Sequence, residues 1–213
     1  MPHFMPKSDQ QPSVLQRSLG YGLSLLLIWQ PALLAAAEPV SPTHSTNGRP
    51  TLDQAANGVP IVNIQNPNGQ GVSQNFYNEL NVGSQGLILN NSQQLTQTQL
   101  GGYIEGNPNL TNGSANLILN EVIGTNPSSL NGYMEVGGRR ADVVVANPNG
   151  ITCNGCGFIN TNHATLTTGT AIMEGGSLSG FDVQGGNIHI GENGLNASNT
   201  NRFDLIARSV EVA

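Results

Sequence analysis

The sequence predicts an all-β fold and, among all-β architectures, a parallel β-helix. Short apolar runs recur along the chain, and each is bounded by Gly, Asn, Pro or Ser, which is the pattern of strands separated by turns. The predicted strand centres at Val144, Leu166, Ile188 and Leu205 lie about one β-helix coil apart. Beyond the amino-terminal leader, no segment has a convincing helical period of apolar residues.

The individual strands are predicted from these apolar runs, taken in chain order. They are Ile61-Val62-Asn63-Ile64, Leu87-Ile88-Leu89, Leu117-Ile118-Leu119, Val143-Val144-Val145, Ala164-Thr165-Leu166, Ala171-Ile172-Met173, Ile188-His189-Ile190 and Leu205-Ile206-Ala207. An antiparallel sandwich is the alternative, because it also has short strands and glycine-rich turns. Small Thr, Ser and Ala residues suit a narrow solenoid interior, in which asparagines can stack in ladders. A solenoid needs a capped end, and the less regular residues 59–103 are expected to supply it.

The amino terminus has the order of features of a secretory signal peptide. Lys7 and Arg17 are basic, residues 19–34 are mostly apolar, and Ala37 ends a run of small residues. The alternative is a membrane anchor, but Gln30-Pro31 interrupts an apolar run that is already shorter than the roughly 20 residues of a spanning helix. We therefore predict a signal peptide at residues 1–37, with cleavage after Ala37.

The remaining residues are expected to form a linker and one domain. Residues 38–57 contain Pro39, Pro42 and Pro50 among small polar residues and read as a linker, which leaves one domain at residues 58–213. Charged residues make up 9% of the chain, the net charge is −6, and the single lysine is Lys7. This balance argues against nucleic acid as a partner and against binding to anionic lipid.

The sequence predicts no enzyme, no cofactor and no metal site. Parallel β-helices include pectate lyases, which need clustered acidic calcium ligands and a basic residue, and no lysine follows Lys7. His163 and His189 have no evident nucleophile or acid partner. The chain also lacks a G-x-S-x-G element, a phosphate loop and a metal-ligand spacing.

The two cysteines directly follow a turn-rich corner, Asn147-Pro148-Asn149-Gly150-Ile151. Cys153 and Cys156 admit a redox centre, half a zinc site or a short structural disulfide. A redox centre is expected near a βαβ pattern, and a zinc site needs further ligands. We favour the disulfide, which suits an oxidising compartment.

Two motifs carry a resemblance to a known family. Asn107-Pro108-Asn109-Leu110 and Asn147-Pro148-Asn149-Gly150-Ile151 resemble the paired N-P-N-L and N-P-N-G-I signature of the two-partner secretion domain. This domain, also called the haemagglutination activity domain, opens filamentous haemagglutinins, haemolysin-type exoproteins and contact-dependent inhibition proteins of the CdiA type. The resemblance covers about residues 57–213. Its supporting blocks are Val59-Pro60-Ile61-Val62-Asn63-Ile64, Gly71-Val72-Ser73-Gln74-Asn75, Asn120-Glu121-Val122 and Phe203-Asp204-Leu205-Ile206-Ala207-Arg208.

The resemblance implies a fold and a function. The fold is a right-handed parallel β-helix with an N-terminal cap and small extra-helical strands. Such domains of Gram-negative bacteria leave the cytoplasm through the general secretion machinery, and the POTRA domains of an outer-membrane TpsB-type β-barrel transporter recognise them in the periplasm. They then fold outside the cell and template the β-helix behind them. The expected location is secreted or cell-surface.

Three alternatives remain open at this point. The two motifs are either corners of the β-helix or contacts for the transporter, and both roles can coexist. The alternative function is that of a secreted β-solenoid that binds host cells or glycans directly. Because residues 209–213 stop inside a strand-like pattern, we also expect a fragment of a larger adhesin, haemolysin or toxin. The missing part would contact a host or neighbouring-cell surface.

Overall fold

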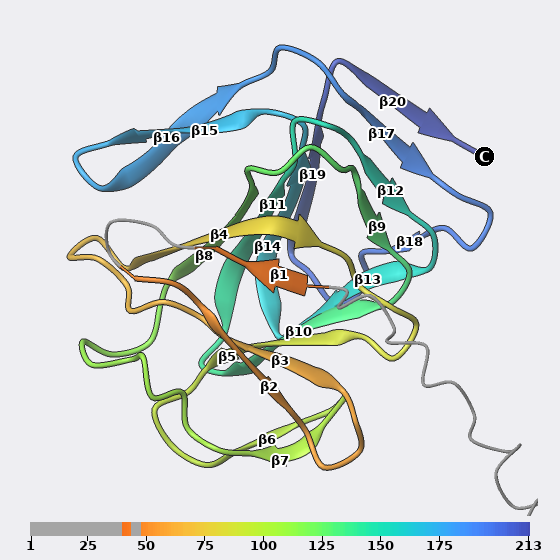
Figure 1. Cartoon of the computed structure of the whole chain (residues 1–213). Coiled ribbons are helices and arrows are strands. Elements are labelled where there is room, and N and C mark those ends of the chain that lie inside the picture. The colour runs from red at the N-terminus through yellow and green to blue at the C-terminus, as the bar shows by residue number, and fades with distance from the viewer. Residues whose placement is uncertain (1–39, 44–47) are drawn as a thin grey trace, which may run out of the picture. The chain divides into compact units, whose positions relative to one another are not determined.

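The computed structural model describes residues 40–43 and 48–213 (Figure 1). The predicted signal peptide, residues 1–37, lies outside the described residues. Within the described ranges the regular structure consists of strands, and no helix is present. Accordingly, no described segment has the helical length and hydropathy of a membrane span.

Three sheets form the body of the domain. The first sheet has the order β1 (Val40–Pro42), β4 (Val72–Leu80), β8 (Leu117–Val122), β11 (Ala141–Ala146), β14 (Thr161–Thr167) and β19 (Arg202–Ile206). The second sheet has the order β2 (Thr51–Gln54), β3 (Pro60–Asn63), β5 (Leu87–Asn91), β10 (Tyr133–Gly138), β13 (Cys156–Ile159) and β18 (Leu195–Asn196). The third sheet has the order β9 (Ser128–Leu130), β12 (Ile151–Cys153), β17 (Asn187–Ile190) and β20 (Ser209–Val212).

The chain visits these sheets in turn, and each round is one coil of a parallel β-helix. The first coil is β3 and β4, closed by Val82, which bridges to Leu130 of the third sheet. The second coil is β5, β8 and β9, the third is β10, β11 and β12, the fourth is β13, β14 and β17, and the fifth is β18, β19 and β20. All pairings between successive coils are parallel. The predicted parallel β-helix is confirmed.

Apolar side chains stack in rows inside the coils. In the first sheet Ile118, Val143, Ala164 and Phe203 are neighbours in register from coil to coil. The first three belong to one buried core cluster, and the partly buried Phe203 packs against it. Because successive side chains of a strand point to opposite faces, the residues directly before and after each of these four point outward. The core is therefore a column of stacked rows, and each coil depends on its neighbours to bury its own row.

Two hairpins outside the coils cover the outer faces of two sheets. The hairpin β6 (Thr96–Thr98) and β7 (Gly102–Ile104) packs Ile104 against Ile61 and Ile88 of the second sheet. The hairpin β15 (Thr170–Glu174) and β16 (Ser177–Asp182) covers Leu119 and Val144 of the first sheet. Figure 1 draws the first hairpin at the bottom and the second at the upper left. Strands buried on both faces are continuously apolar. The small extra-helical strands expected from the resemblance are present.

The cap of the β-helix lies in the stretch that was expected to be a linker. Strand β1 pairs antiparallel with β4, and β2 pairs antiparallel with β3, so both cover the first coil. The interpretation of residues 38–57 as a linker is therefore wrong in their described part. That interpretation rested on prolines such as Pro42, but proline is compatible with an edge strand, which needs few ladder hydrogen bonds. The expectation that residues 59–103 form the cap is also wrong, because they form the first coil, β5 and the first hairpin.

Buried asparagines form short ladders between coils, as the sequence suggested. Asn75 and Asn120 are neighbours in register, and both are fully buried. The Asn120 carboxamide accepts a hydrogen bond of 3.0 Å from the Tyr77 hydroxyl and donates one of 3.1 Å to the Val144 carbonyl. Burial raises the pKa of Tyr77 far above its usual value, so the phenol remains a donor. These amides satisfy polar atoms that the apolar rows leave without partners.

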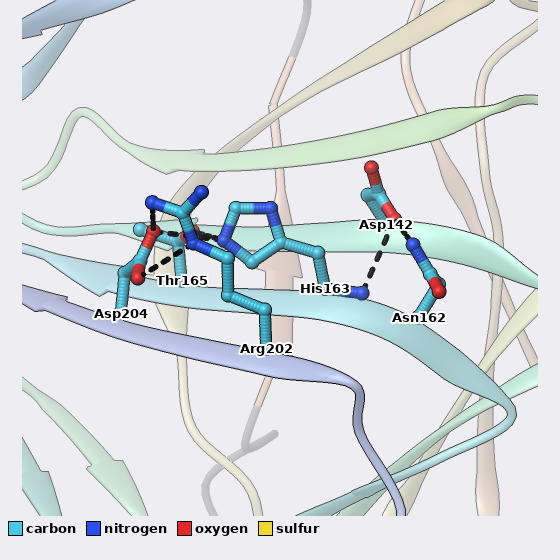
Figure 2. Close-up of polar contacts among 6 residues, drawn as sticks. All are labelled: Asp142, Asn162, His163, Thr165, Arg202 and Asp204. Atoms are coloured by element: carbon cyan, nitrogen blue, oxygen red, sulfur yellow. Dashed lines mark hydrogen bonds and ion pairs between the residues drawn. The ribbon is translucent and has the colours of Figure 1, made fainter.

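Side-chain contacts on the outer face of the first sheet join the fifth coil to the fourth. The His163 Nε2 atom lies 2.8 Å from the Asp204 Oδ2 atom, and the Arg202 guanidinium also contacts that carboxylate (Figure 2). Asp142 of the third coil accepts a hydrogen bond from the backbone N–H of His163, where β14 is irregular. The same His163 nitrogen faces both Asp204 and Thr165, so the group is a structural bridge between strands.

We expect Asn120→Ala to lower the free energy of unfolding by about 2–3 kcal/mol, because the buried Tyr77 hydroxyl and Val144 carbonyl both lose their partner. Urea unfolding of the purified domain measures this change. Tyr77→Phe should cost less in the Asn120→Ala background than in the wild type. Asn199→Ala, at an exposed position, is the control and should change stability by less than about 0.5 kcal/mol. Additive effects of the Tyr77 and Asn120 changes would contradict the ladder.

We expect Asp204 to contribute to acid sensitivity. The Arg202 guanidinium, and after it His163, holds the pKa of the Asp204 carboxyl below its usual value. A carboxyl group with a depressed pKa stabilises the fold above its unfolded pKa and loses this contribution as the pH falls through its folded pKa. Asp204→Asn should therefore lower the free energy of unfolding at pH 6 by less than about 1 kcal/mol. It should also reduce the further loss of that free energy between about pH 5 and pH 2.

Urea unfolding across this pH range measures the Asp204 effect. Asp182→Asn is the matched control, because Asp182 accepts a hydrogen bond from the neutral Gln184 amide on the second hairpin. An unchanged pH profile in Asp204→Asn would contradict the prediction.

Candidate functional site

The first motif, residues 107–110, lies between β7 and β8, where the chain turns from the second sheet into the first. The buried Asn107 amide donates hydrogen bonds of 2.9 Å to the Ile64 carbonyl and 2.8 Å to the Asn90 carbonyl. Its Oδ1 atom accepts the backbone N–H of Asn109 at 2.8 Å, and the Asn109 amide reaches the Asn63 carbonyl at 3.0 Å. Leu110 then enters the core. The motif therefore ties the second coil to the first.

The second motif, residues 147–151, repeats this arrangement between β11 and β12, where the chain turns from the first sheet into the third. Asn147 is completely buried, and its amide donates to the Asn126 carbonyl at 3.0 Å and to the Ser128 hydroxyl at 2.9 Å. Its Oδ1 atom accepts the backbone N–H of Asn149 at 3.0 Å, and the Asn149 amide reaches the Gly124 carbonyl at 2.9 Å. The motif ties the third coil to the second.

The backbone geometry at the end of the second motif explains why glycine and isoleucine occupy positions 150 and 151. Gly150 has a φ of 120°, which side-chain-bearing residues rarely adopt, and its carbonyl accepts the backbone N–H of Ser128 at 3.0 Å. Ile151 begins β12 and is buried in the core. The glycine thus lets the chain turn sharply enough for the next residue to join the third sheet.

The two motifs share one chemistry but lie at different corners. In each, the first asparagine is buried, its oxygen closes a local turn, and its amide donates to an earlier segment of the solenoid. Pro108, Pro148 and Asn149 are exposed. A partner that meets the folded domain would therefore touch the prolines and Asn149, and the first asparagines would be out of its reach.

A small hollow adjoins the exposed part of the second motif. Its volume is about 300 Å³, and Glu121, Ile123, Pro148 and Asn149 contribute to its lining. Ile123 is 58% exposed, so an apolar side chain lies at the rim of the hollow. Burial raises the pKa of the Glu121 carboxyl, which accepts a hydrogen bond from the Gln74 amide. The hollow gives this corner a mixed apolar and polar surface.

A disulfide joins Cys153 to Cys156 across the turn from β12 to β13, with the two Cα atoms 5.3 Å apart. Both cysteines are buried, and the bridge lies directly after the second motif. The described residues contain no group of three or more His, Cys, Asp or Glu side chains arranged to hold a metal ion. This geometry is that of a short disulfide that closes the turn, which is the alternative that the sequence favours over a redox centre or half a zinc site.

A third N-P-N triplet lies outside the two motifs that the sequence predicts. Asn66-Pro67-Asn68-Gly69 lies between β3 and β4, at the same corner as the first motif and one coil earlier. The Asn66 Oδ1 atom accepts the backbone N–H groups of Thr111 and Asn112, just past the first motif. The signal that identifies it is the repeated triplet itself, which occurs three times in the chain.

Comparison with known proteins identifies a family and several relatives. The family model described as TPS secretion domain matches residues 38–213. The chain is 51% identical over 211 residues to a 16S rRNA endonuclease CdiA from Enterobacter cloacae, covering 98% of this chain and 6% of that protein. It is 54% identical over 166 residues to Toxin CdiA from Yersinia pestis, covering 78% of this chain and 5% of that protein.

A hemolysin and a solved structure extend these similarities. The chain is 43% identical over 189 residues to a hemolysin from Serratia marcescens, covering 88% of this chain and 12% of that protein. A crystal structure of a filamentous hemagglutinin secretion domain aligns with a TM-score of 0.75 and 42% identity, over 81% of this chain and 56% of that chain. The chain thus spans only a small part of the length of the curated relatives that it matches.

These similarities agree with the architecture of the described residues. The family is a secretion domain and not a catalytic one, and its members have a TpsB-type transporter as partner. Exoproteins of this kind are secreted or exposed on the surface of Gram-negative bacteria. With the family model matched over residues 38–213, the parallel β-helix and about half of the residues identical to CdiA proteins, this chain belongs to the TPS secretion domain family.

Proposed function

We propose that this chain is the export signal of a longer exoprotein and the template on which the following coils fold. The POTRA domains of an outer-membrane TpsB-type transporter recognise it in the periplasm after the signal peptide, residues 1–37, has directed it through the general secretion machinery. The domain then folds outside the cell. The effector activity, and the contact with a host or neighbouring cell, belong to the rest of that exoprotein.

The observation that supports the template role is that each coil is built on the coil before it in parallel register. In the first sheet β4, β8, β11, β14 and β19 pair in that order. In the third sheet Val210 and Val212 of β20 stack on Ile188 and Ile190 of β17. A folded coil therefore offers backbone groups beside an apolar row, on which a following coil can form.

The contacts of the motifs support a corner role first and a docking role second. The amides of Asn107 and Asn147 are buried and hydrogen-bonded, so a folded-state partner has no access to them. We propose that both motifs act mainly by fixing successive coils. A transporter that meets this corner in its folded form would contact the exposed Pro148 and Asn149, beside the hollow with Ile123.

We expect export to require the cognate transporter and intact corners. Asn147→Ala leaves the backbone N–H of Asn149 and the Ser128 hydroxyl without a partner, and should lower the unfolding free energy by about 2 kcal/mol or more. The exported fraction should fall with stability and should be near zero without the transporter. Urea unfolding, and immunoblots of periplasm and culture medium, measure these effects.

Pro148→Ala is the control that separates the two motif roles, because Pro148 is exposed in the same corner. Unchanged stability with reduced binding to isolated POTRA domains in this variant supports the docking face. If Asn147→Ala exports normally although it is destabilised, the link between corner stability and export is wrong. Export that is independent of the transporter would refute the proposed function itself.

We expect the disulfide to contribute modestly to stability. For a loop as short as that between Cys153 and Cys156, the chain-entropy model gives about 2 kcal/mol. The double variant Cys153→Ser with Cys156→Ser should therefore unfold at lower urea and still be exported. Urea unfolding in parallel with the export assay measures both. Loss of export with unchanged stability would assign the cysteines a direct role in recognition.

A further inference from the structure

The third N-P-N triplet, Asn66-Pro67-Asn68-Gly69, contacts two parts of the domain that are far apart in the sequence. Neither the first nor the second motif includes it. It lies in the turn between β3 and β4 of the first coil, and from here on it is called the third motif. Its two asparagines face different partners, and each makes hydrogen bonds through its side chain.

Asn66 holds the backbone that leaves the first motif. Its Oδ1 atom accepts the N–H of Thr111 at 3.0 Å and that of Asn112 at 2.9 Å, across 45 and 46 residues of sequence. In return, the first motif donates to the backbone that precedes Asn66, because Asn107 and Asn109 bind the Ile64 and Asn63 carbonyls. The two corners are therefore bonded to each other in both directions.

The direction of the Asn66 contact follows from its place in the solenoid. In the other two motifs the first asparagine donates its amide hydrogens to earlier segments. The third motif lies in the first coil, which is covered by antiparallel cap strands and follows no other coil among the described residues. Asn66 accordingly accepts hydrogen bonds through its Oδ1 atom from backbone N–H groups of the coil that follows. The first asparagines of the other two motifs instead donate from their amides to earlier segments.

Asn68 holds the tip of the second hairpin. Its Oδ1 atom accepts the backbone N–H groups of Gln70 at 2.9 Å and Val72 at 3.1 Å, which closes the turn into β4. Its amide donates a hydrogen bond of 2.7 Å to the carbonyl of Gly176, 108 residues away, in the turn between β15 and β16. Gly176 has a φ of 84°, and an added Cβ atom would lie 3.3 Å from the Asn68 amide nitrogen.

We propose that the third motif is a positioning element for export, in which Asn66 orders the first motif and Asn68 anchors the second hairpin over the first sheet. Its effect on local order rests on the contacts alone. Its effect on export rests on the proposed function. A chain that lacks the Asn66 contact should fold with a loosened first motif and should pass the outer membrane less efficiently.

Amide hydrogen exchange of the purified chain tests the positioning role. Asn66→Ala should raise the exchange rate of the Asn112 amide by about tenfold or more, because this amide loses its acceptor. The Thr111 amide should respond less, because its N–H also donates to the Asn109 carbonyl at 3.1 Å. Asn66→Asp keeps an oxygen acceptor and should restore most of the protection. Asn112→Ala is the matched control, because it leaves the backbone donor in place. Wild-type exchange in Asn66→Ala would overturn the proposal.

Asn68→Ala tests the second contact independently. It should raise exchange in the turn around Gly176 and in β4 near Val72, and leave the Thr111 amide at its wild-type rate. A uniform rise throughout the domain in this variant would indicate general destabilisation and would overturn the assignment of separate roles to Asn66 and Asn68.

The export assay then links the motif to function. With the cognate transporter present, Asn66→Ala should be exported less efficiently than wild type, and Asn66→Asp should be close to wild type. If Asn66→Ala raises exchange but exports normally while Asn107→Ala is retained, the third motif has no positioning role in export. If Asn107→Ala and deletion of the transporter both leave export intact, the proposed function fails, and the exchange result stands by itself.

Discussion

The structure depends on satisfying the backbone at the corners of the β-helix. A strand end leaves N–H and C=O groups without ladder partners, and stacked coils bury those groups away from water. Asparagine supplies both an acceptor and two donors on a short side chain. Asn107 and Asn147 use them in the same way, with the oxygen closing the turn and the amide bonding an earlier segment. A charged side chain at such a buried corner would carry a desolvation cost that a neutral amide avoids.

The same constraint explains the unusual composition. Inside the coils, stacked Val, Ile and Leu rows exclude water, and the buried Asn75 and Asn120 satisfy polar atoms that the rows surround. Outside the coils, two hairpins cover apolar faces, so those strands need few charged residues. Where charged and ionisable groups do gather, around Asp204, they join two coils at the surface (Figure 2). Surface pairs of this kind are weak, and the apolar rows remain the main source of stability.

The cap and the third motif are the features that the local sequence did not predict. Strands β1 and β2 are short and contain or adjoin proline, and their antiparallel partners β4 and β3 determine that they are strands at all. In sequence, residues 66–69 are an ordinary turn, and only their contacts with the following coil distinguish them. Asn66 bonds residues 45 and 46 positions later, and Asn68 bonds one that is 108 positions later. Contacts over such distances leave no periodic trace in the local sequence.

The sequence by itself determined the all-β class, the positions of the core strands, the two N-P-N motifs and the family resemblance. These are local features, because strand alternation and turn residues act over a few neighbouring positions. Only the tertiary structure decided which sheet each corner faces, which coil each asparagine reaches, how Asp204 meets His163, and that residues near Val40 and Leu52 form the cap. The physical reason is that a solenoid joins residues one coil or more apart, and coil length varies with its insertions. The stacking register therefore exists only once the coils have formed.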